Sequence, residues 1–332
     1  MPLEPAAAQL IHALQQQGFQ SFENIGVEAT RAAVDSFTGL QLAPGEVART
    51  VEVSYGSDPQ QRARVYVPAG DGPFPVVLYL HGGGFVGGGL AVAEEPARAL
   101  AHDAGVIVVA ATYRRAPEAR FPAAHDDALQ ALEWVVKEVA GYGGDPQRIA
   151  VAGDSAGGNL AASVVNRARD AGQPEVRAQV LIYPLIDPVA DTTSRREYAE
   201  GYLLHLTALK WFGRQYVAGP GDVTDPRLAV DLSPAAGLPP TLILTNEYDI
   251  LRDEAEQYGD RLRDAGVDVT VRRFDGLLHG VYWMSAAVPR CAEQRRAVAD
   301  FLRDTLASTA RKAATGGISR RRAGLCTGSH GE

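Results

Sequence analysis

The sequence predicts an α/β fold in which helices flank a mostly parallel β-sheet. Short, continuous apolar runs such as Val76–Leu80 and Val106–Ala111 are typical of strands that are buried on both faces of a sheet. Longer segments with apolar residues at helical spacing separate these runs. Strand and helix patterns alternate from residue 75 to 183 and again from 241 to 306, and this order indicates crossover connections between parallel strands.

The segment before this alternation predicts two helices and a hairpin. A first helix is expected to end at Gly18, because the residues before it repeat at helical spacing, namely Ala7, Leu10, Ile11 and Leu14. A second helix is expected from Ile25 to Phe37. Strands Val47–Ser54 and Arg62–Val67 are expected to pair around a turn at residues 56–59. Alternation in the second of these strands is typical of an edge strand with one solvated face.

The alternating part supplies the remaining elements of the sheet. Further strands are expected at residues 149–152, 178–183, 241–245 and 267–274. Helices are expected at residues 94–103, 121–139, 156–168, 254–265 and 290–306. The stretch from Asp187 to Pro226 contains helical patterns but no strand, so it is expected to interrupt the sheet as an insert.

The last residues, 308–332, differ in composition from the rest of the chain. Arg, Gly, Ala, Ser and Thr dominate there, and Arg320–Arg322 form a basic run. Three arginines among glycines bury no apolar surface, so this tail is predicted to be disordered and solvated. The alternative is a tail that binds nucleic acid or serves in targeting.

Composition and charge exclude several classes of function. The chain has 332 residues, of which 46% are hydrophobic and 22% are charged, as in an ordinary globular protein. A formal net charge of -8 disfavours nucleic acid and anionic membranes as partners. The first residues lack a signal-peptide pattern, and no stretch has the apolar length of a membrane span. Cys291 and Cys326 are spaced for neither a disulfide framework nor a metal site. We therefore expect a cytoplasmic protein without a metal ion.

The stretch around Ser155 is the strongest functional signal. Gly153 and Gly157 flank Ser155 in a G-x-S-x-G pattern. A strand pattern precedes this motif and a helix pattern follows it, and that context distinguishes a nucleophile elbow from an ordinary glycine-rich turn. At such an elbow the serine hydroxyl is held out from a strained turn, and side chains two residues away would collide across it. The sequence therefore predicts Ser155 as a nucleophile.

A nucleophilic serine needs a base, and His279 is the candidate among seven histidines. It lies in Gly276–Gly280, directly after the strand expected at residues 267–274. Ligands of open α/β sheets bind at the carboxyl ends of the strands, where this loop is expected. The other histidines fall in or beside helix patterns, in the strandless insert, in the tail or, for His81, before a run of glycines.

Three carboxylates compete to be the acid that orients this base. Glu247, Asp249 and Asp253 all follow the strand expected at residues 241–245. Asp253 begins a helix and is explained by the helix dipole. Asp249 is preferred to Glu247 because it lies deeper in the loop, although spacing does not decide between them. The order Ser155, Asp249, His279 is that of an α/β-hydrolase.

The segment His81–Phe85 predicts an anion-stabilising loop. Its three glycines let backbone amides approach a ligand oxygen without obstruction by side chains. A flexible loop or a phosphate cradle is the alternative, but for nucleotide binding the segment lacks the Lys-Ser/Thr pair of a Walker loop and the G-x-G-x-x-G spacing.

Together these motifs resemble the bacterial hormone-sensitive-lipase-like (family IV) carboxylesterases of the α/β-hydrolase superfamily. The resemblance runs from about Pro44 to Leu306. It rests on His81-Gly-Gly-Gly-Phe85, Tyr113-Arg114, Ala116-Pro-Glu118, Phe121-Pro-Ala123, Gly153-Asp-Ser-Ala-Gly-Gly-Asn-Leu160, Glu247-Tyr-Asp, Leu251-Arg-Asp-Glu254, Asp275-Gly and His279-Gly280.

The resemblance implies a catalytic triad of Ser155, Asp249 and His279. It also implies an oxyanion hole formed by the amides of three residues, Gly83, Gly84 and Ala156. It assigns residues 44–186 and 227–307 to the catalytic α/β-hydrolase domain. Residues 1–43 and 187–226 would then form a helical cap over the site. The substrate-binding residues that it implies are Phe85, Leu204, Trp211 and Phe212, and packing within the cap is an equal alternative for the last three.

We therefore predict a carboxylesterase that hydrolyses short- to medium-chain acyl esters through an acyl-enzyme intermediate. The expected partner is a small-molecule ester, no organic cofactor is needed, and a homodimer is compatible with the sequence. One alternative is an amidase or arylformamidase that uses the same triad. Another is a non-catalytic binding protein, because plant gibberellin receptors resemble this family but have lost the catalytic histidine. The presence of His279 argues against that alternative.

Overall fold

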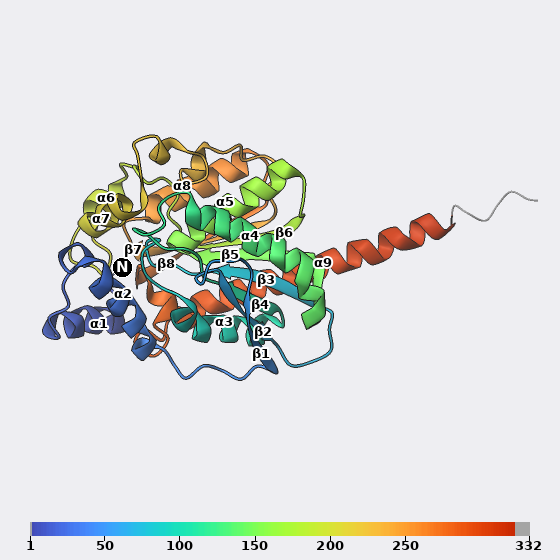
Figure 1. The fold of residues 1–332 in the computed structure, drawn as a ribbon, viewed down its shortest axis with the longest axis horizontal. Coiled ribbons are helices and arrows are strands. Elements are labelled where there is room, and N and C mark those ends of the chain that lie inside the picture. The colour runs from blue at the N-terminus through green and yellow to red at the C-terminus, as the bar shows by residue number, and fades with distance from the viewer. Residues whose placement is uncertain (1, 323–332) are drawn as a thin grey trace, which may run out of the picture.

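An eight-stranded sheet forms the centre of the molecule in a computed structural model that describes residues 2–322. The strand order is β1-β2-β4-β3-β5-β6-β7-β8 (Figure 1). The strands are β1 (Arg49–Ser54), β2 (Arg62–Val67), β3 (Phe74–Leu80), β4 (Ile107–Ala111), β5 (Gly144–Asp154), β6 (Val176–Ile182), β7 (Thr241–Tyr248) and β8 (Val269–Leu278). β2 runs antiparallel to β1 and β4, and all other pairs are parallel. The predicted mostly parallel sheet is confirmed.

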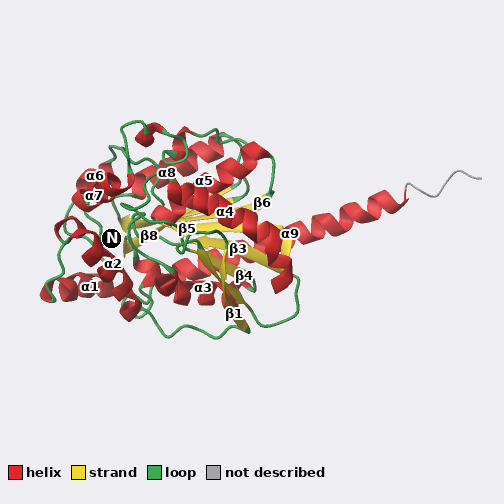
Figure 2. Cartoon of the chain, viewed as in Figure 1, coloured by secondary structure: helices red, strands yellow, loops and turns green. Residues whose placement is uncertain are grey.

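Helices cover both faces of this sheet, as the strands between two helical layers in Figure 2 show. The helices are α1 (Pro5–Gln16), α2 (Gly26–Ser36), α3 (Leu90–Ala104), α4 (Ala123–Glu138), α5 (Ala156–Ala171), α6 (Thr193–Glu197), α7 (Leu206–Tyr216), α8 (Arg252–Asp264) and α9 (Cys291–Arg322). α3 packs against α9 on one face, and α4 packs against α5 on the other. Every residue of β4 is buried between these layers, which explains its continuous apolar sequence.

The expectation of an edge strand at residues 62–67 is wrong. β2 lies between β1 and β4, so β1 is the strand at the edge. One face of the strand was expected to be solvated, yet Tyr66 on that face is fully buried, and the guanidinium of Arg98 from α3 lies 5.4 Å from its ring centroid. The alternation along β2 reflects long side chains that extend over the sheet, because an arginine can bury its aliphatic stem and keep its charge in water.

Two segments that are far apart in the sequence lie side by side at one end of the sheet. Figure 1 shows α1 and α2 next to α6 and α7 at this end. The short 3₁₀ helix Phe22–Asn24 contacts α7, and the rings of Phe22 and Phe212 are 5.5 Å apart. Thr207 at the start of α7 donates a hydrogen bond of 2.7 Å to Glu23. These contacts join the N-terminal segment to the strandless insert.

The last helix continues beyond the predicted end of the catalytic domain at residue 307. α9 runs to Arg322, and its C-terminal part projects away from the rest of the molecule (Figure 1). Residues 323–332 of the predicted disordered tail lie outside the described part of the chain. In residues 2–322, none of the helices combines the length and the apolar character that crossing a membrane requires.

Candidate active site

Ser155 occupies a strained turn between β5 and α5. β5 ends at Asp154 and α5 begins at Ala156, and Ser155 between them has φ 56° and ψ -120°. A positive φ in a residue other than glycine costs energy that the surrounding structure must offset. A Cβ on Gly153 would overlap the carbonyl oxygen of Gly157, so the turn leaves no room for a side chain there. The expected steric reason for glycine at this position is therefore confirmed.

Two hydrogen bonds connect Ser155 with His279 and Asp249. The Nε2 atom of His279 lies 2.9 Å from Oγ of Ser155, and its Nδ1 atom lies 2.7 Å from Oδ2 of Asp249. Asp249 is 1% exposed and His279 is 9% exposed, so solvent scarcely reaches the contact between them. The arrangement can hold the imidazole in the tautomer that accepts a proton from the serine.

Parallel pairing of β7 and β8 brings the acid and the base together. The two strands are neighbours, and their register extends to the pair Tyr248 and Leu278. Asp249 and His279 are the next residues along each strand, so they meet at the same edge of the sheet although 30 residues separate them. The backbone amide of Leu251 donates a bond of 2.9 Å to the other carboxylate oxygen of Asp249 and fixes its orientation.

The other two candidate acids take part in different contacts. The carboxylate of Glu247 accepts a hydrogen bond of 2.7 Å from the amide of Gly276. The carboxylate of Asp253 accepts one of 2.8 Å from the amide of Ser194 and forms an ion pair with Arg252. Of the three candidates, Asp249 is the one whose carboxylate is hydrogen-bonded to His279.

Asp154, which directly precedes Ser155, is hydrogen-bonded to the glycine-rich loop at residues 81–85. Its Oδ1 atom accepts hydrogen bonds from the Tyr79 hydroxyl at 2.6 Å and from the amide of Gly82 at 3.1 Å. Burial raises the pKa of Asp154 to about 6. Gly83 and Gly84 follow with φ 114° and 62°, conformations that favour glycine. Sequence reasoning missed this contact, although the acidic residue directly before the nucleophile was visible in the motif.

A cavity of about 110 Å³ opens above Ser155. Gly83, Gly84, Ala156 and His279 line it, so the predicted oxyanion residues and the base face the same space. Its other walls are mostly apolar, and they come from the catalytic body as well as from both segments at this end of the sheet. They include Phe22, Val34, Phe37, Tyr183, Leu185, Pro188, Leu203, Leu209, Leu251, Trp283 and Met284.

Three of the four predicted substrate-binding residues line this cavity. They are Phe85, Leu204 and Phe212, and Trp211 is not among the lining residues. Consecutive helical residues point about 100° apart, so α7 directs Phe212 into the cavity and Trp211 away from it. Trp211 is still buried and packs edge-on against Phe212 at 5.1 Å. Sequence reasoning also missed Val34 and Phe37, because their helical spacing is equally typical of core packing.

Two other buried histidines lie near the site without joining the triad. His125 is hydrogen-bonded to the Tyr216 hydroxyl at 2.7 Å and to Oδ1 of Asn159 at 2.9 Å, and burial lowers its pKa to about 3. His81 stacks on Tyr113, and burial lowers its pKa to about 4. Both rings are therefore neutral near pH 7 and unsuited to taking a proton from Ser155.

The described residues contain no group of three or more His, Cys, Asp or Glu side chains that could hold a metal ion. Cys291 is a buried free thiol, and burial raises its pKa. Cys326 lies outside the part of the chain that the structure describes.

Known proteins resemble this chain in sequence and in fold. The model of a family with the α/β hydrolase fold matches residues 77–283. An ethyl acetate hydrolase of Pseudomonas putida is 40% identical over 250 residues, which cover 73% of this chain and 78% of that enzyme. A carboxylesterase of Mycobacterium tuberculosis is 40% identical over 275 residues, which cover 81% and 86%. The structure of an esterase from the archaeon Pyrobaculum calidifontis superposes with a TM-score of 0.86 at 36% identity, covering 92% of this chain and 99% of that one.

Proposed function

Because this chain belongs to the hormone-sensitive-lipase-like esterases of the α/β-hydrolase superfamily and is a serine carboxylic-ester hydrolase, we propose that Ser155, His279 and Asp249 carry out its reaction. The observation that supports this most is the continuous pair of hydrogen bonds from Ser155 through His279 to Asp249, at 2.9 and 2.7 Å. With these hydrogen bonds in place, the histidine can accept the serine proton while the carboxylate holds the imidazole, and no side chain has to move first.

The first half of the reaction acylates Ser155. As the serine oxygen attacks the ester carbonyl, Nε2 of His279 accepts its proton. Asp249 holds the imidazole through Nδ1 and stabilises the imidazolium that forms. His279 then donates the proton to the leaving alcohol, and the acyl group remains on Ser155.

The amides of Gly83, Gly84 and Ala156 stabilise the tetrahedral intermediate. Negative charge develops on the former carbonyl oxygen, and preorganised N–H donors that face it lower the barrier. Helix α5 begins at Ala156, so the partial positive charge at the N-terminus of this helix acts on the same oxygen. Water then attacks the acyl-enzyme with His279 as base, and the carboxylic acid leaves.

Residues 1–43 and 187–226 act as a cap that bounds the substrate site. Phe22, Val34 and Phe37 from the first segment and Leu204 and Phe212 from the second line the cavity above Ser155. Its volume of about 110 Å³ is slightly below that of an engineered cavity of about 150 Å³ that binds benzene. Room of this size supports short- to medium-chain acyl groups as substrates.

The substrate class is tested by kcat/KM for 4-nitrophenyl esters with acyl chains from two to sixteen carbons. Each buried methylene contributes about 0.8 kcal/mol until the cavity is full, so kcat/KM should rise, reach a maximum at short to medium length and then fall. A steady rise to the longest chain, or activation at an emulsion interface, would contradict the bounded cavity.

The same assay distinguishes the alternatives. A 4-nitroanilide or an N-formyl arylamine with the preferred acyl group should react far more slowly than the ester. Faster turnover of the amide would identify an amidase, and absence of turnover with every compound would identify a binding protein.

We also propose a cytoplasmic enzyme, because a chain of this size with a buried free thiol suits a reducing compartment. A homodimer is a further proposal, which light scattering on the purified protein tests directly.

A further inference from the structure

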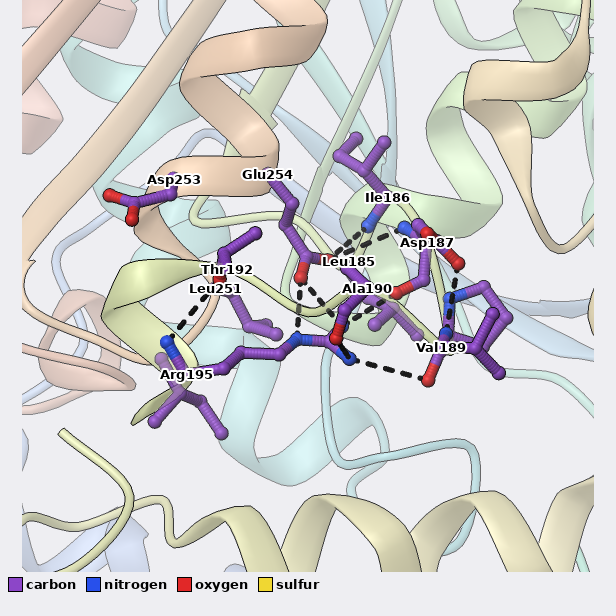
Figure 3. Close-up of polar contacts among 12 residues, drawn as sticks. Leu185, Ile186, Asp187, Val189, Ala190, Thr192, Arg195, Leu251, Asp253 and Glu254 are labelled. Atoms are coloured by element: carbon purple, nitrogen blue, oxygen red, sulfur yellow. Dashed lines mark hydrogen bonds and ion pairs between the residues drawn. The ribbon is translucent and has the colours of Figure 1, made fainter. Parts of the chain in front are cut away.

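A buried ion pair lies beside the substrate cavity and takes no part in the proposed chemistry. Arg195 of α6 and Glu254 of α8 are joined by a hydrogen bond of 2.8 Å from Nε and an ion pair of 2.5 Å to the same carboxylate oxygen. Their side chains are 5% and 3% exposed. Figure 3 shows that the pair links the first turn of α8 to the loop that follows β6.

Arg195 donates hydrogen bonds to three backbone carbonyl groups of that loop. Its guanidinium donates to the carbonyl oxygen of Asp187 at 2.6 Å, of Ala190 at 2.9 Å and of Pro188 at 3.4 Å. Together with the two contacts to Glu254, these bonds engage all five N–H donors that an arginine carries. A lysine has three donors on one nitrogen and cannot reproduce this geometry.

Glu254 holds the same loop from the other side. Its Oε1 atom accepts hydrogen bonds from the backbone amides of Ile186 at 2.9 Å and Asp187 at 3.4 Å. The loop at residues 186–190 is therefore fixed through its amides by Glu254 and through its carbonyls by Arg195. The buried carboxylate of Glu254 thus finds all of these hydrogen-bond partners within one short segment, residues 186–195.

This loop forms part of the active site. Leu185 and Pro188 line the cavity, and the amide of Leu185 donates a bond of 3.2 Å to the carbonyl oxygen of Ser155. Leu251, which precedes α8, lines the same cavity and binds Asp249 through its amide. The ion pair thus connects the helix after the triad acid with the loop that contacts the nucleophile.

Stability alone is a weak reason for such a pair. Removing two charges from water is costly, and apolar residues of similar volume can often replace a buried ion pair without loss of stability. Apolar residues, however, would supply neither donors nor acceptors to the loop, whose backbone groups would lose these partners. What the pair provides in particular is a fixed position for this loop.

We propose that Arg195 and Glu254 are positioning residues that hold Leu185 and Pro188 as a rigid wall of the substrate cavity. The inference rests on the proposed role of Ser155 and His279 and concerns substrate binding rather than proton transfer. Loosening the wall should weaken the fit of the acyl chain while the nucleophile and its base stay in place.

The test compares Arg195→Lys and Glu254→Gln with the wild type and with Arg196→Lys. Arg196 is on the same helix but exposed, and it forms an ion pair with Asp191 at the surface. Four quantities are measured: KM and kcat across the acyl series, the rate at which diethyl 4-nitrophenyl phosphate labels Ser155, and the melting temperature. Labelling reports on the nucleophile and its base and does not depend on acyl length.

For both variants of the pair we expect KM for the preferred ester to rise about tenfold and the maximum of the acyl series to flatten, as misplacement of a substrate wall predicts. The labelling rate should change less than about twofold, and Arg196→Lys should match the wild type. A variant that melts at lower temperature but keeps the wild-type KM and acyl profile would overturn the inference, since the pair would then only stabilise the fold.

The double variant Arg195→Met with Glu254→Leu provides a second test if a single variant does not fold. It removes both charges and both sets of loop contacts, so it should show the same rise in KM. Wild-type kinetics in this variant would overturn the inference, as would a labelling rate that falls as far as kcat/KM does. Absence of ester hydrolysis in the wild type would instead overturn the proposed function on which the inference rests.

Discussion

Backbone geometry at single residues sets the position of Ser155, the proposed nucleophile. Ser155 adopts φ 56°, and Gly153 provides the space that this turn needs. Residues in such conformations cost on the order of 1–3 kcal/mol, which the packing of β5 and α5 must offset. The strain places the serine hydroxyl at the edge of the sheet, 2.9 Å from Nε2 of His279. The geometry is thus built into the fold before substrate binds.

The acid of the triad is tested by two substitutions in one loop. Asp249→Asn should lower kcat about ten-thousandfold, because His279 would lose the partner that sets its tautomer. Glu247→Gln is the matched control and should cost far less, since its carboxylate binds the amide of Gly276. Steady-state kinetics with the preferred ester measure both, and a larger loss in Glu247→Gln would make Glu247 the acid.

At this scale the sequence indicated the three hydrogen-bonded residues Ser155, His279 and Asp249 more directly than the residues around them. Ser155 and His279 were predicted because their motifs carry a specific geometry, and Asp249 was preferred among three candidate acids. Val34 and Phe37 were not predicted as cavity residues. Their apolar spacing is the same whether a helix faces the core or a cavity, and only the packing of one segment on another distinguishes the two.

Among the elements, a buried polar network fixes α7 to the body of the molecule. His125 of α4 bonds Tyr216 at the end of α7 and Asn159 of α5. Asn159 in turn donates to the carbonyl oxygens of Leu185 at 3.0 Å and Leu228 at 2.7 Å. The ring of Tyr216 also stacks on Phe85 at 4.1 Å. The network therefore links the insert to residues that line the cavity.

Because this network contains a buried neutral histidine, the free energy of unfolding should decrease at acid pH. The pKa of His125 is about 3 in the folded protein and about 6.5 in an unfolded chain, so between these values the unfolded state binds one more proton. The free energy of unfolding should fall as the pH decreases from 6.5 toward 3, by about 1.4 kcal/mol per pH unit for this group. His81 acts in the same direction between pH 6.5 and about 4.

Urea unfolding of the wild type and of His125→Gln between pH 4.5 and 6 measures this effect. The variant should lose stability less steeply with falling pH, by about 1.4 kcal/mol per pH unit, whatever its stability at neutral pH. Equal slopes for the two proteins would show that His125 is not the group responsible.

The periodicity of the sequence predicted where the strands and helices lie along the chain, but it did not predict which strands are neighbours in the sheet. The apolar runs predicted β3, β4 and β7 because most of the residues in these strands are buried. The position of β2 was mispredicted, since its alternation reflects arginine side chains over a covered surface and not an exposed edge. Strand order depends on crossover connections, which a local pattern does not specify.

At the scale of the whole molecule, the sheet positions the triad and two distant segments bound the space above it. The carboxyl ends of β5, β7 and β8 meet where α1, α2, α6 and α7 lie together (Figure 1). Motifs indicated the sheet and the insert from the sequence. The contact between Glu23 and Thr207, which joins the two segments, had no sequence signal.

The C-terminal tail should be dispensable. Deleting residues 311–332 should change neither activity nor melting temperature beyond error, because that part of the sequence has no apolar periodicity with which to pack. Deletion from residue 300 is the control and should destabilise the protein by several kcal/mol, since it removes the buried Leu302 and Leu306. A clear drop in melting temperature after the shorter deletion would show that the tail packs on the body.

The measurement that tests the central claim most directly is the rate of ester hydrolysis by Ser155→Ala. Ser163→Ala is the matched control, because Ser163 is buried in α5, which begins directly after Ser155, and its hydroxyl has no hydrogen-bond partner among the described residues. With circular dichroism and melting temperature showing both variants folded, Ser155→Ala should lose at least about a thousandfold in kcat while Ser163→Ala keeps wild-type activity. A folded Ser155→Ala enzyme that retains more than about a thousandth of the wild-type turnover would contradict the assignment of Ser155 as the nucleophile.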